Sequence, residues 1–315
     1  FHRGYDSKNY FKSDRLLGQH IFPRIVTSLL YSLRSHAFAD GRMQRLIGWF
    51  LFLLTGAAGA MPVHTPVPGG IAIVRIDASS QASELPTVRF QGRRVLVARD
   101  AKGWLAIVGI PLDTKPGAVT LEVDGLGERS TGAHSFEVTP KQYPVQKLTI
   151  ADNRKVDPPP EDMKRILREQ EVITKVRTHW APSESIDLSL MLPADAPLSS
   201  RFGLRRVLNG QSRNPHNGLD LAVPRGTPIR TTAAGIVTFA DDLFFAGKTV
   251  FVDHGQGLIS MYAHLDEIGV RVGDPLTRGQ RLGLSGMTGR VTGPHLHWTI
   301  YLNGTAIDPE IFVRP

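Results

Sequence analysis

Histidine and aspartate residues in the C-terminal half of the chain have the types and spacing of a metal centre. His216 and Asp220 lie four residues apart, and His295 and His297 flank a single leucine about eighty residues later. The chain contains no cysteine, so a zinc site in it must use imidazole and carboxylate ligands. Catalytic zinc takes three such protein ligands and leaves one position for water. The pattern therefore predicts a catalytic centre for one zinc ion.

The local sequence indicates how these side chains could converge. Gly218 follows Asn217 and favours a turn that leads into a strand carrying Asp220. His295 and His297 would share one face of another strand, about 6.5–7 Å apart, so only one of them can comfortably bind the zinc. Spacing alone leaves open which of the two it is.

A third strand is expected to end at His264, which could approach the centre from the other side. Two imidazoles that do not bind the metal, His264 and one of the His-Leu-His pair, would then lie beside a zinc-bound water. Such groups suit proton transfer and stabilisation of a tetrahedral oxyanion. The set therefore predicts metal-assisted amide hydrolysis, without the HExxH motif of many zinc peptidases.

Short apolar segments separated by glycine-rich turns indicate the elements that must position these residues. They predict a mainly β fold with a β-sandwich over residues 62–150, a linker with a helix over 151–185, and a metal-binding β domain over 186–315. The helix is expected from Glu161 to about Thr178, because apolar residues recur there near helical spacing. In the last region, strands are predicted at 220–223, 235–239, 248–252, 258–262 and 297–301, with turns at 253–257, 272–274 and 284–286.

The N-terminal 60 residues have the pattern of an export signal. Residues 43–60 combine a short basic start, an apolar run from Leu46 to Leu54 and an Ala58-Gly59-Ala60 cleavage site. The apolar run is short for a membrane span, so we expect cleavage and no stable span afterwards. Residues 1–42 show no clear periodicity, and we interpret them as a translated upstream or disordered extension.

Composition excludes some functional classes. Apolar residues make up 41% of the chain, which is enough for packed cores. The net charge is +8, but the chain has no dense basic run with interleaved aromatic residues, so nucleic-acid binding is not expected. A mild positive charge suits an anionic polymer. Oligomeric state cannot be predicted from these features, although a monomer is favoured.

The segment from about Leu198 to Phe312 resembles the lysostaphin-type (LytM) zinc metallopeptidase family. The resemblance covers a little over a third of the chain. It rests on Ser200-Arg201-Phe202-Gly203, His216-Asn217-Gly218-Leu219-Asp220-Leu221, Gly235-Ile236-Val237, Val252-Asp253-His254-Gly255, Tyr262-Ala263-His264-Leu265, Val272-Gly273-Asp274, Gly279-Gln280, Gly283 and Gly293-Pro294-His295-Leu296-His297.

The resemblance implies a role for each residue of the set. The zinc ligands would be His216, Asp220 and His297, and the catalytic pair would be His264 and His295. The implied fold is an antiparallel β-sheet with a groove, preceded by an immunoglobulin-like β domain. The implied partner is peptidoglycan, outside the cytoplasm and in the periplasm of a Gram-negative bacterium. An alternative is a non-catalytic regulator that activates another wall hydrolase, but such members have often lost ligands and this chain keeps all five positions.

The walls of the groove are less predictable than its metal centre. Candidate lining residues are Arg201, Phe202, Arg205, Asn209, Phe244, Phe245 and Thr292. The bond that is cleaved, in a cross-link or a stem peptide, cannot be predicted from spacing.

Overall fold

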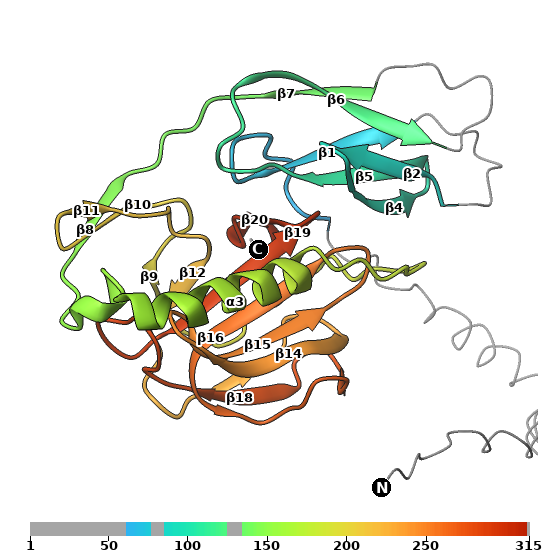
Figure 1. Ribbon diagram of the computed structural model, residues 1–315. Coiled ribbons are helices and arrows are strands. Elements are labelled where there is room, and N and C mark those ends of the chain that lie inside the picture. Colours follow the sequence, from blue (N-terminus) through green and yellow to red (C-terminus); the bar gives the residue numbers. More distant parts are fainter. Residues whose placement is uncertain (1–60, 77–84, 125–133, 314–315) are drawn as a thin grey trace, which may run out of the picture. The chain divides into compact units, whose positions relative to one another are not determined.

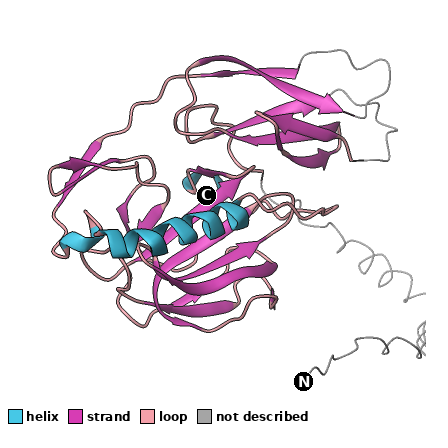
Figure 2. Cartoon of the chain, viewed as in Figure 1, coloured by secondary structure: helices cyan, strands magenta, loops and turns pink. Residues whose placement is uncertain are grey.

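The computed structural model describes residues 61–76, 85–124 and 134–313 of the chain. Strands dominate these residues, and the one long helix among them is α3 (Pro160–Arg177) (Figure 2). The predicted mainly β architecture is thereby confirmed. The predicted extension 1–42 and signal peptide 43–60 lie outside the described residues. Within the described part of the chain, no helix is long and apolar enough to cross a membrane.

Seven strands of the N-terminal region form two antiparallel sheets (Figure 1). One sheet has the strand order β1-β5-β4 and the other the order β3-β2-β6-β7. Apolar side chains of both sheets, such as Val88 and Phe90 from one and Ala106 and Val108 from the other, share one core. The strands are β1 (Ile71–Ile76), β2 (Thr87–Phe90), β3 (Arg93–Arg94), β4 (Leu96–Asp100), β5 (Gly103–Gly109), β6 (Gly117–Asp124) and β7 (His134–Val138).

The segment that follows this sandwich contains one strand and one short helix. In this segment β8 (Val145–Leu148) pairs in parallel with β10 (Arg205–Leu208), which in turn pairs with β11 (Gln211–Ser212). The short 3-10 helix η1 (Asn153–Lys155) comes next. Sequence periodicity alone could not reveal β8, because its pairing partner lies about sixty residues away.

Helix α3 lies where the apolar spacing predicted a helix. Pro160 occupies its first turn, Glu161 and Asp162 complement the positive N-terminal end of the helix dipole, and Lys175 and Arg177 complement the C-terminal end. Its apolar side, including Ile173 and Val176, packs on the cluster formed by the C-terminal sheet. The helix thus covers part of that sheet.

The C-terminal region is built on one large sheet with the path β17-β14-β15-β16-β19-β12-β9. Three further strands join it, with β18 pairing β13 and β16, and β20 pairing β19. The elements are β9 (Leu198–Ser200), β12 (Leu219–Leu221), β13 (Pro228–Arg230), β14 (Gly235–Leu243), β15 (Gly247–Asp253), β16 (Ile259–Ile268), β17 (Pro275–Leu276), β18 (Arg281–Ser285), β19 (Leu296–Leu302), β20 (Thr305–Ile307) and the helix α4 (Glu310–Val313).

One predicted turn in this region is wrong. Residues 284–286 were expected to form a turn, but Leu284 and Ser285 end strand β18. Gly283, inside this strand, lets two backbones approach each other. A Cβ atom at Gly283 would lie 2.3 Å from the carbonyl oxygen of Glu267 on β16.

The N-terminal and C-terminal regions share buried contacts. Ile71 and Ile107 of the sandwich belong to the same apolar cluster as Trp298 of β19. The side chain of Asn303 accepts a hydrogen bond from the Gly109 N–H at 2.6 Å and donates one to the Gly109 carbonyl oxygen at 3.0 Å. These contacts connect the sandwich to the β19–β20 turn.

Candidate metal centre

Three of the predicted residues form a compact cluster of possible metal ligands. His216, Asp220 and His297 are buried, and their ligand atoms all lie within 4.8 Å of one another. Asp220 Oδ1 is 3.0 Å from His216 Nε2 and 2.8 Å from His297 Nδ1, and the two nitrogen atoms are 3.0 Å apart. Tetrahedral zinc with ligands at about 2.0–2.1 Å would place them roughly 3.3 Å apart, so the cluster has nearly the size of a zinc site.

The order and register of the strands bring these residues together. Asp220 on β12 lies directly opposite His297 on β19, and His297 lies opposite Ala263 on β16. His216 lies just before β12, in an irregular segment that bends at Gly218 and leads into the strand, where a turn was predicted. Gly218 lets this segment lie close to β19, because a Cβ atom at Gly218 would lie 2.4 Å from the Trp298 carbonyl oxygen.

The outer nitrogen atoms of the two histidines are held by hydrogen bonds. His216 Nδ1 donates to the carbonyl oxygen of Arg201 at 2.8 Å, which leaves the Nε2 lone pair facing the cluster. His297 Nε2 lies 2.9 Å from Thr299 Oγ1, and its Nδ1 faces the cluster. Partners of this kind fix the orientation of metal-binding imidazoles.

The protonation states also suit a cation. Burial lowers the pKa of His297 to about 4, so its imidazole is neutral at pH 7. Burial alone would raise the pKa of Asp220, but the interactions of its carboxylate with the neighbouring rings of His216 and His297 outweigh burial and lower that pKa well below the usual range. Lone pairs of a carboxylate and two imidazoles that face one another at about 3 Å repel unless a cation lies among them. This donor set therefore fits a divalent metal such as zinc.

The two remaining histidines of the set lie beside the cluster. The ring of His264 is centred 4.8 Å from that of His295 and 5.9 Å from that of His297. His295 Nε2 is 3.9 Å from Asp220 Oδ1. His295 immediately precedes β19 and forms an isolated bridge with Gly286, so the expectation that it shares a strand with His297 is wrong by one residue.

His264 owes its position to an irregularity in β16. Its φ of 64° is unusual for a residue other than glycine, and the register of β15 and β16 shifts at this point. Such bulges redirect a side chain out of the regular alternation. His264 Nδ1 donates to the carbonyl oxygen of Thr288 at 2.8 Å, so Nε2 carries the lone pair. Burial, and then the neighbouring His295 and His297, lower the pKa of His264 well below 6.5.

The cluster opens into a groove with a volume of about 900 Å³. His264 and His297 line it, together with residues of α3 such as Ile173 and Thr174 and the short loop Pro111–Asp113 of the sandwich. Two of the predicted lining residues are correct, since Phe245 borders this groove and Thr292 borders a smaller adjoining cavity.

The other predicted lining residues have different positions. Phe202 and Phe244 are buried, Arg205 is exposed, Arg201 pairs with Glu310, and Asn209 bonds to the backbone of Ile150. The lining residues that were not predicted from the sequence include Arg206 and Arg290, each of which borders both cavities. Their positions in the sequence could have indicated them, because each arginine lies within about ten residues of a predicted site residue.

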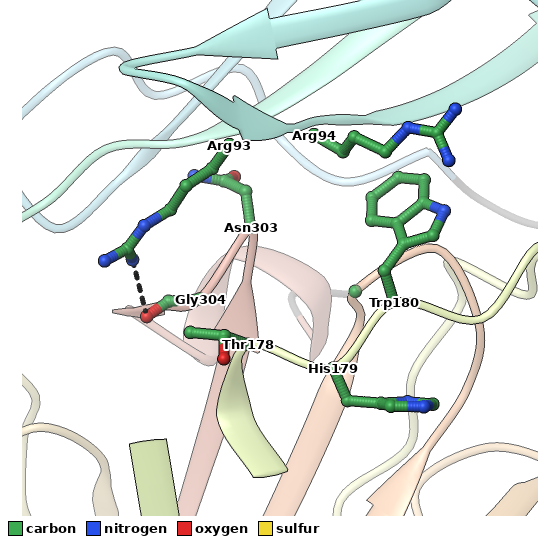
Figure 3. Close-up of a pocket in the computed structure, with 8 residues that line it drawn as sticks. Arg93, Arg94, Thr178, His179, Trp180, Asn303 and Gly304 are labelled. Atoms are coloured by element: carbon green, nitrogen blue, oxygen red, sulfur yellow. Dashed lines mark hydrogen bonds between the residues drawn. The ribbon is translucent and has the colours of Figure 1, made fainter. Parts of the chain in front are cut away.

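A separate cavity of about 240 Å³ lies where β3 meets the β19–β20 turn and the end of α3 (Figure 3). Arg93 donates to the Gly304 carbonyl oxygen at 3.2 Å, and the Arg94 guanidinium lies 5.5 Å from the centre of the Trp180 ring (Figure 3). None of the predicted metal-centre residues lines it. These contacts join the two regions of the molecule.

Comparison with known proteins places both regions in one family. The model of "Peptidase family M23" matches residues 214–309, and that of "Peptidase family M23 N-terminal domain" matches residues 64–141. The crystal structure of a candidate M23 peptidase from Pseudomonas aeruginosa is 44% identical in sequence. It superposes with a TM-score of 0.64 over 79% of this chain and 94% of that one.

Curated relatives match the C-terminal region. The peptidoglycan DD-endopeptidase ShyA of Vibrio cholerae is 44% identical over 112 residues, or 35% of this chain and 26% of the relative. The DD-carboxypeptidase/endopeptidase Mpg of Neisseria meningitidis is 38% identical over 118 residues, or 38% of this chain and 27% of the relative. The matched region thus spans about a quarter of these relatives. On the matches to both domain models and to the Pseudomonas structure, the chain belongs to peptidase family M23.

Proposed function

We propose that this protein is a zinc-dependent endopeptidase that hydrolyses peptide bonds in peptidoglycan. The observation that carries the proposal is the convergence of His216, Asp220 and His297, with His264 and His295 beside them. Family membership and the names of the relatives support the substrate class. The predicted export signal supports a site of action in the periplasm of a Gram-negative bacterium, where this polymer lies.

His216 through Nε2, Asp220 through Oδ1 and His297 through Nδ1 would hold the zinc. When bound, zinc supplies a Lewis acid that acidifies water and polarises a carbonyl group. The protein contributes a rigid frame for this ion, because Arg201 and Thr299 fix the two imidazoles from behind.

His264 and His295 would move the protons of the reaction. The Nδ1–H groups of both rings are held by carbonyl oxygens, those of Thr288 and Gly293, at 2.8 Å. Each Nε2 therefore presents a lone pair to the site. One ring accepts a proton from the attacking water, and the proton then passes to the amide nitrogen as the C–N bond breaks. The other ring, once that ring is protonated, stabilises the developing oxyanion.

The test is digestion of purified sacculi by the zinc-loaded chain. We expect release of soluble muropeptides that a chelator abolishes and added zinc restores. The variant His264→Ala should retain zinc and lose release, because it removes a proton carrier and no ligand. A zinc-loaded protein that releases nothing from sacculi would contradict the proposal and favour the alternative of a non-catalytic regulator.

A further inference from the structure

Arg206 and Arg290 place two guanidinium groups in the groove beside the metal cluster. Both line the main groove and the smaller adjoining cavity, which His264 and His297 also line. Arg206 Nη2 is 3.3 Å from Asp220 Oδ2, so its head group lies next to a proposed metal ligand. Burial, and then the positive charges of Arg206 and Arg213, lower the pKa of Arg290.

The carboxylates of the described residues do not balance these cations. Asp220 is the one carboxylate within 4 Å of Arg206, and Arg290 has none within that distance among the described residues. Arg290 donates to the Lys155 carbonyl oxygen at 3.1 Å and lies over the Phe245 ring at 4.5 Å, contacts that orient it without neutralising it. With a divalent cation held by Asp220, the net charge of this part of the groove is strongly positive.

Arg206 also has an unused hydrogen-bond donor. Its Nε atom is buried and has no hydrogen-bond partner among the described residues. An unpaired buried donor is costly, and a planar guanidinium group meets that need best with a carboxylate, which it can bind through two parallel hydrogen bonds. A small anion bound between the two arginines would satisfy both the donor and the charge.

The adjoining cavity has apolar walls around this cationic corner. Leu148 and Ile150 come from the segment after the sandwich, and Leu208 and Val291 from the C-terminal region. A side chain of aliphatic character, next to a carboxylate on the same residue, would fit this combination of surfaces. The cavity also includes Asp220 and His295, so such a residue would adjoin the reacting bond.

On the proposed function, we infer that Arg206 and Arg290 bind the free carboxylate of the residue on the amine side of the scissile bond. In a peptide bond to a C-terminal or cross-linking D-residue, the α-carbon next to the scissile nitrogen bears that carboxylate. Its oxygen atoms then lie within about 5 Å of the scissile carbonyl carbon, the range that separates Arg206 from the metal cluster. The arginines thus determine specificity for bonds that are followed by a free carboxylate.

The test uses a matched pair of synthetic cross-linked peptides. They differ in one group, a carboxylate or a carboxamide on the amine-side α-carbon. We expect the zinc-loaded chain to favour the carboxylate peptide by about 10- to 100-fold in kcat/KM. Arg206→Gln and Arg290→Gln should lose most of this preference, because cleavage of the carboxylate peptide falls much more than cleavage of the carboxamide peptide. Arg206→Lys and Arg290→Lys, which keep the charge but lose the planar fork, should retain part of it.

Arg205→Gln is the matched control, because Arg205 is exposed on the same strand and borders neither cavity. It should keep the full preference. The preference is a ratio within each variant, so a change in zinc content affects both peptides equally and cancels. Equal losses for both peptides in the Gln variants, or no preference in the unaltered chain, would overturn the inference.

Calorimetric binding in the His264→Ala variant separates this inference from the proposed function. We expect the dissociation constant of the carboxylate peptide to be about 10-fold or more below that of the carboxamide, and the arginine variants to remove the difference. Discrimination in binding without any cleavage by the unaltered chain would refute the proposed function and support the carboxylate site. Cleavage of both peptides, bound with equal affinities, would support the proposed function and refute the carboxylate site.

Discussion

At the scale of single residues, the chemistry depends on which nitrogen atom of each histidine is held from behind. Carbonyl oxygens bind Nδ1 of His216, His264 and His295, whereas Thr299 binds Nε2 of His297. The nitrogen atom opposite each contact faces the site. The proposed division into ligands and proton carriers agrees with the distances to Asp220 Oδ1, which are 3.0 Å for His216 and 2.8 Å for His297 but 3.9 Å for His295.

Replacement of a proton carrier should separate activity from metal binding. For His264→Ala and His295→Ala we expect kcat to fall by about 10²- to 10⁴-fold while zinc remains stoichiometric. His216→Ala should lose zinc as well as activity. Rates of muropeptide cleavage and zinc content by elemental analysis check both points. His179→Ala, at a half-exposed ring that pairs with Asp253, serves as the control.

The contact behind His297 gives a second prediction. Thr299→Val removes the hydroxyl group next to His297 Nε2, and we expect zinc affinity to fall by about 10- to 100-fold. Thr299→Ser keeps the hydroxyl group and should bind zinc nearly as well as the unaltered chain. Competition with a chromophoric chelator measures both affinities. Equal affinities of the Val and Ser variants would show that the contact has no such role.

At the scale of elements, the register of the strands brings the site residues together. Asp220 faces His297 across β12 and β19, and the bulge at His264 redirects its ring from β16. The sequence was sufficient to predict the cluster of His216, Asp220 and His297, the strands that carry Asp220 and His297, and helix α3. It was not sufficient for the pairing of β8 with β10 or for the groove walls, because partners distant in sequence determine both.

The close approach at Gly218 can be tested directly. A Cβ atom there would lie 2.4 Å from the Trp298 carbonyl oxygen and 2.7 Å from Thr299 Oγ1. We expect Gly218→Ala to lower the free energy of unfolding by about 1–3 kcal/mol and to weaken zinc binding. Gly293→Ala is the control, since its Cβ atom would meet nothing within 4 Å. Urea denaturation of both variants supplies the comparison.

The turn between β15 and β16 provides a pH prediction. Burial lowers the pKa of His254, whose Nδ1 donates to the Ala234 carbonyl oxygen at 2.7 Å. In the unfolded chain this ring takes up a proton near pH 6.5, whereas in the folded protein it does so only at a lower pH. Stability from this residue is therefore present above pH 6.5 and lost as the pH falls below it, by up to about 1.4 kcal/mol per pH unit.

The measurement is urea unfolding at several values between pH 7.5 and pH 5. His254→Asn cannot take up this proton, so its free energy of unfolding should fall less steeply with pH than that of the unaltered chain. The other histidines contribute equally to both proteins, and the difference between the two slopes isolates His254. Parallel slopes would contradict the assignment.

At the scale of the whole molecule, the groove is not the product of the C-terminal sheet alone. The Pro111–Asp113 loop, β8 and α3 all contribute to its walls or to those of the adjoining cavity. Buried bonds from Asn303 and Gln256 tie the sandwich to that sheet. The N-terminal region and the segment after it therefore contribute directly to the walls of the groove and of the adjoining cavity.

Asn303 tests the connection between the two regions. Asn303→Ala removes two buried hydrogen bonds and leaves both polar groups of Gly109 unpaired. We expect the free energy of unfolding to fall by about 2–4 kcal/mol. Asn153→Ala, at an exposed residue of η1, should change it by less than about 0.5 kcal/mol. An equal response of the two variants in urea denaturation would argue against a structural role for this contact.

The central claim is that a metal centre formed by His216, Asp220 and His297 hydrolyses peptide bonds of peptidoglycan with water. Mass spectrometry of a purified cross-linked muropeptide, digested by the zinc-loaded chain in ¹⁸O-labelled water, tests it most directly. We predict two peptide products, with one ¹⁸O atom in the newly formed carboxyl group and no cleavage by His264→Ala. An intact cross-link after incubation with stoichiometrically zinc-loaded protein would contradict the claim.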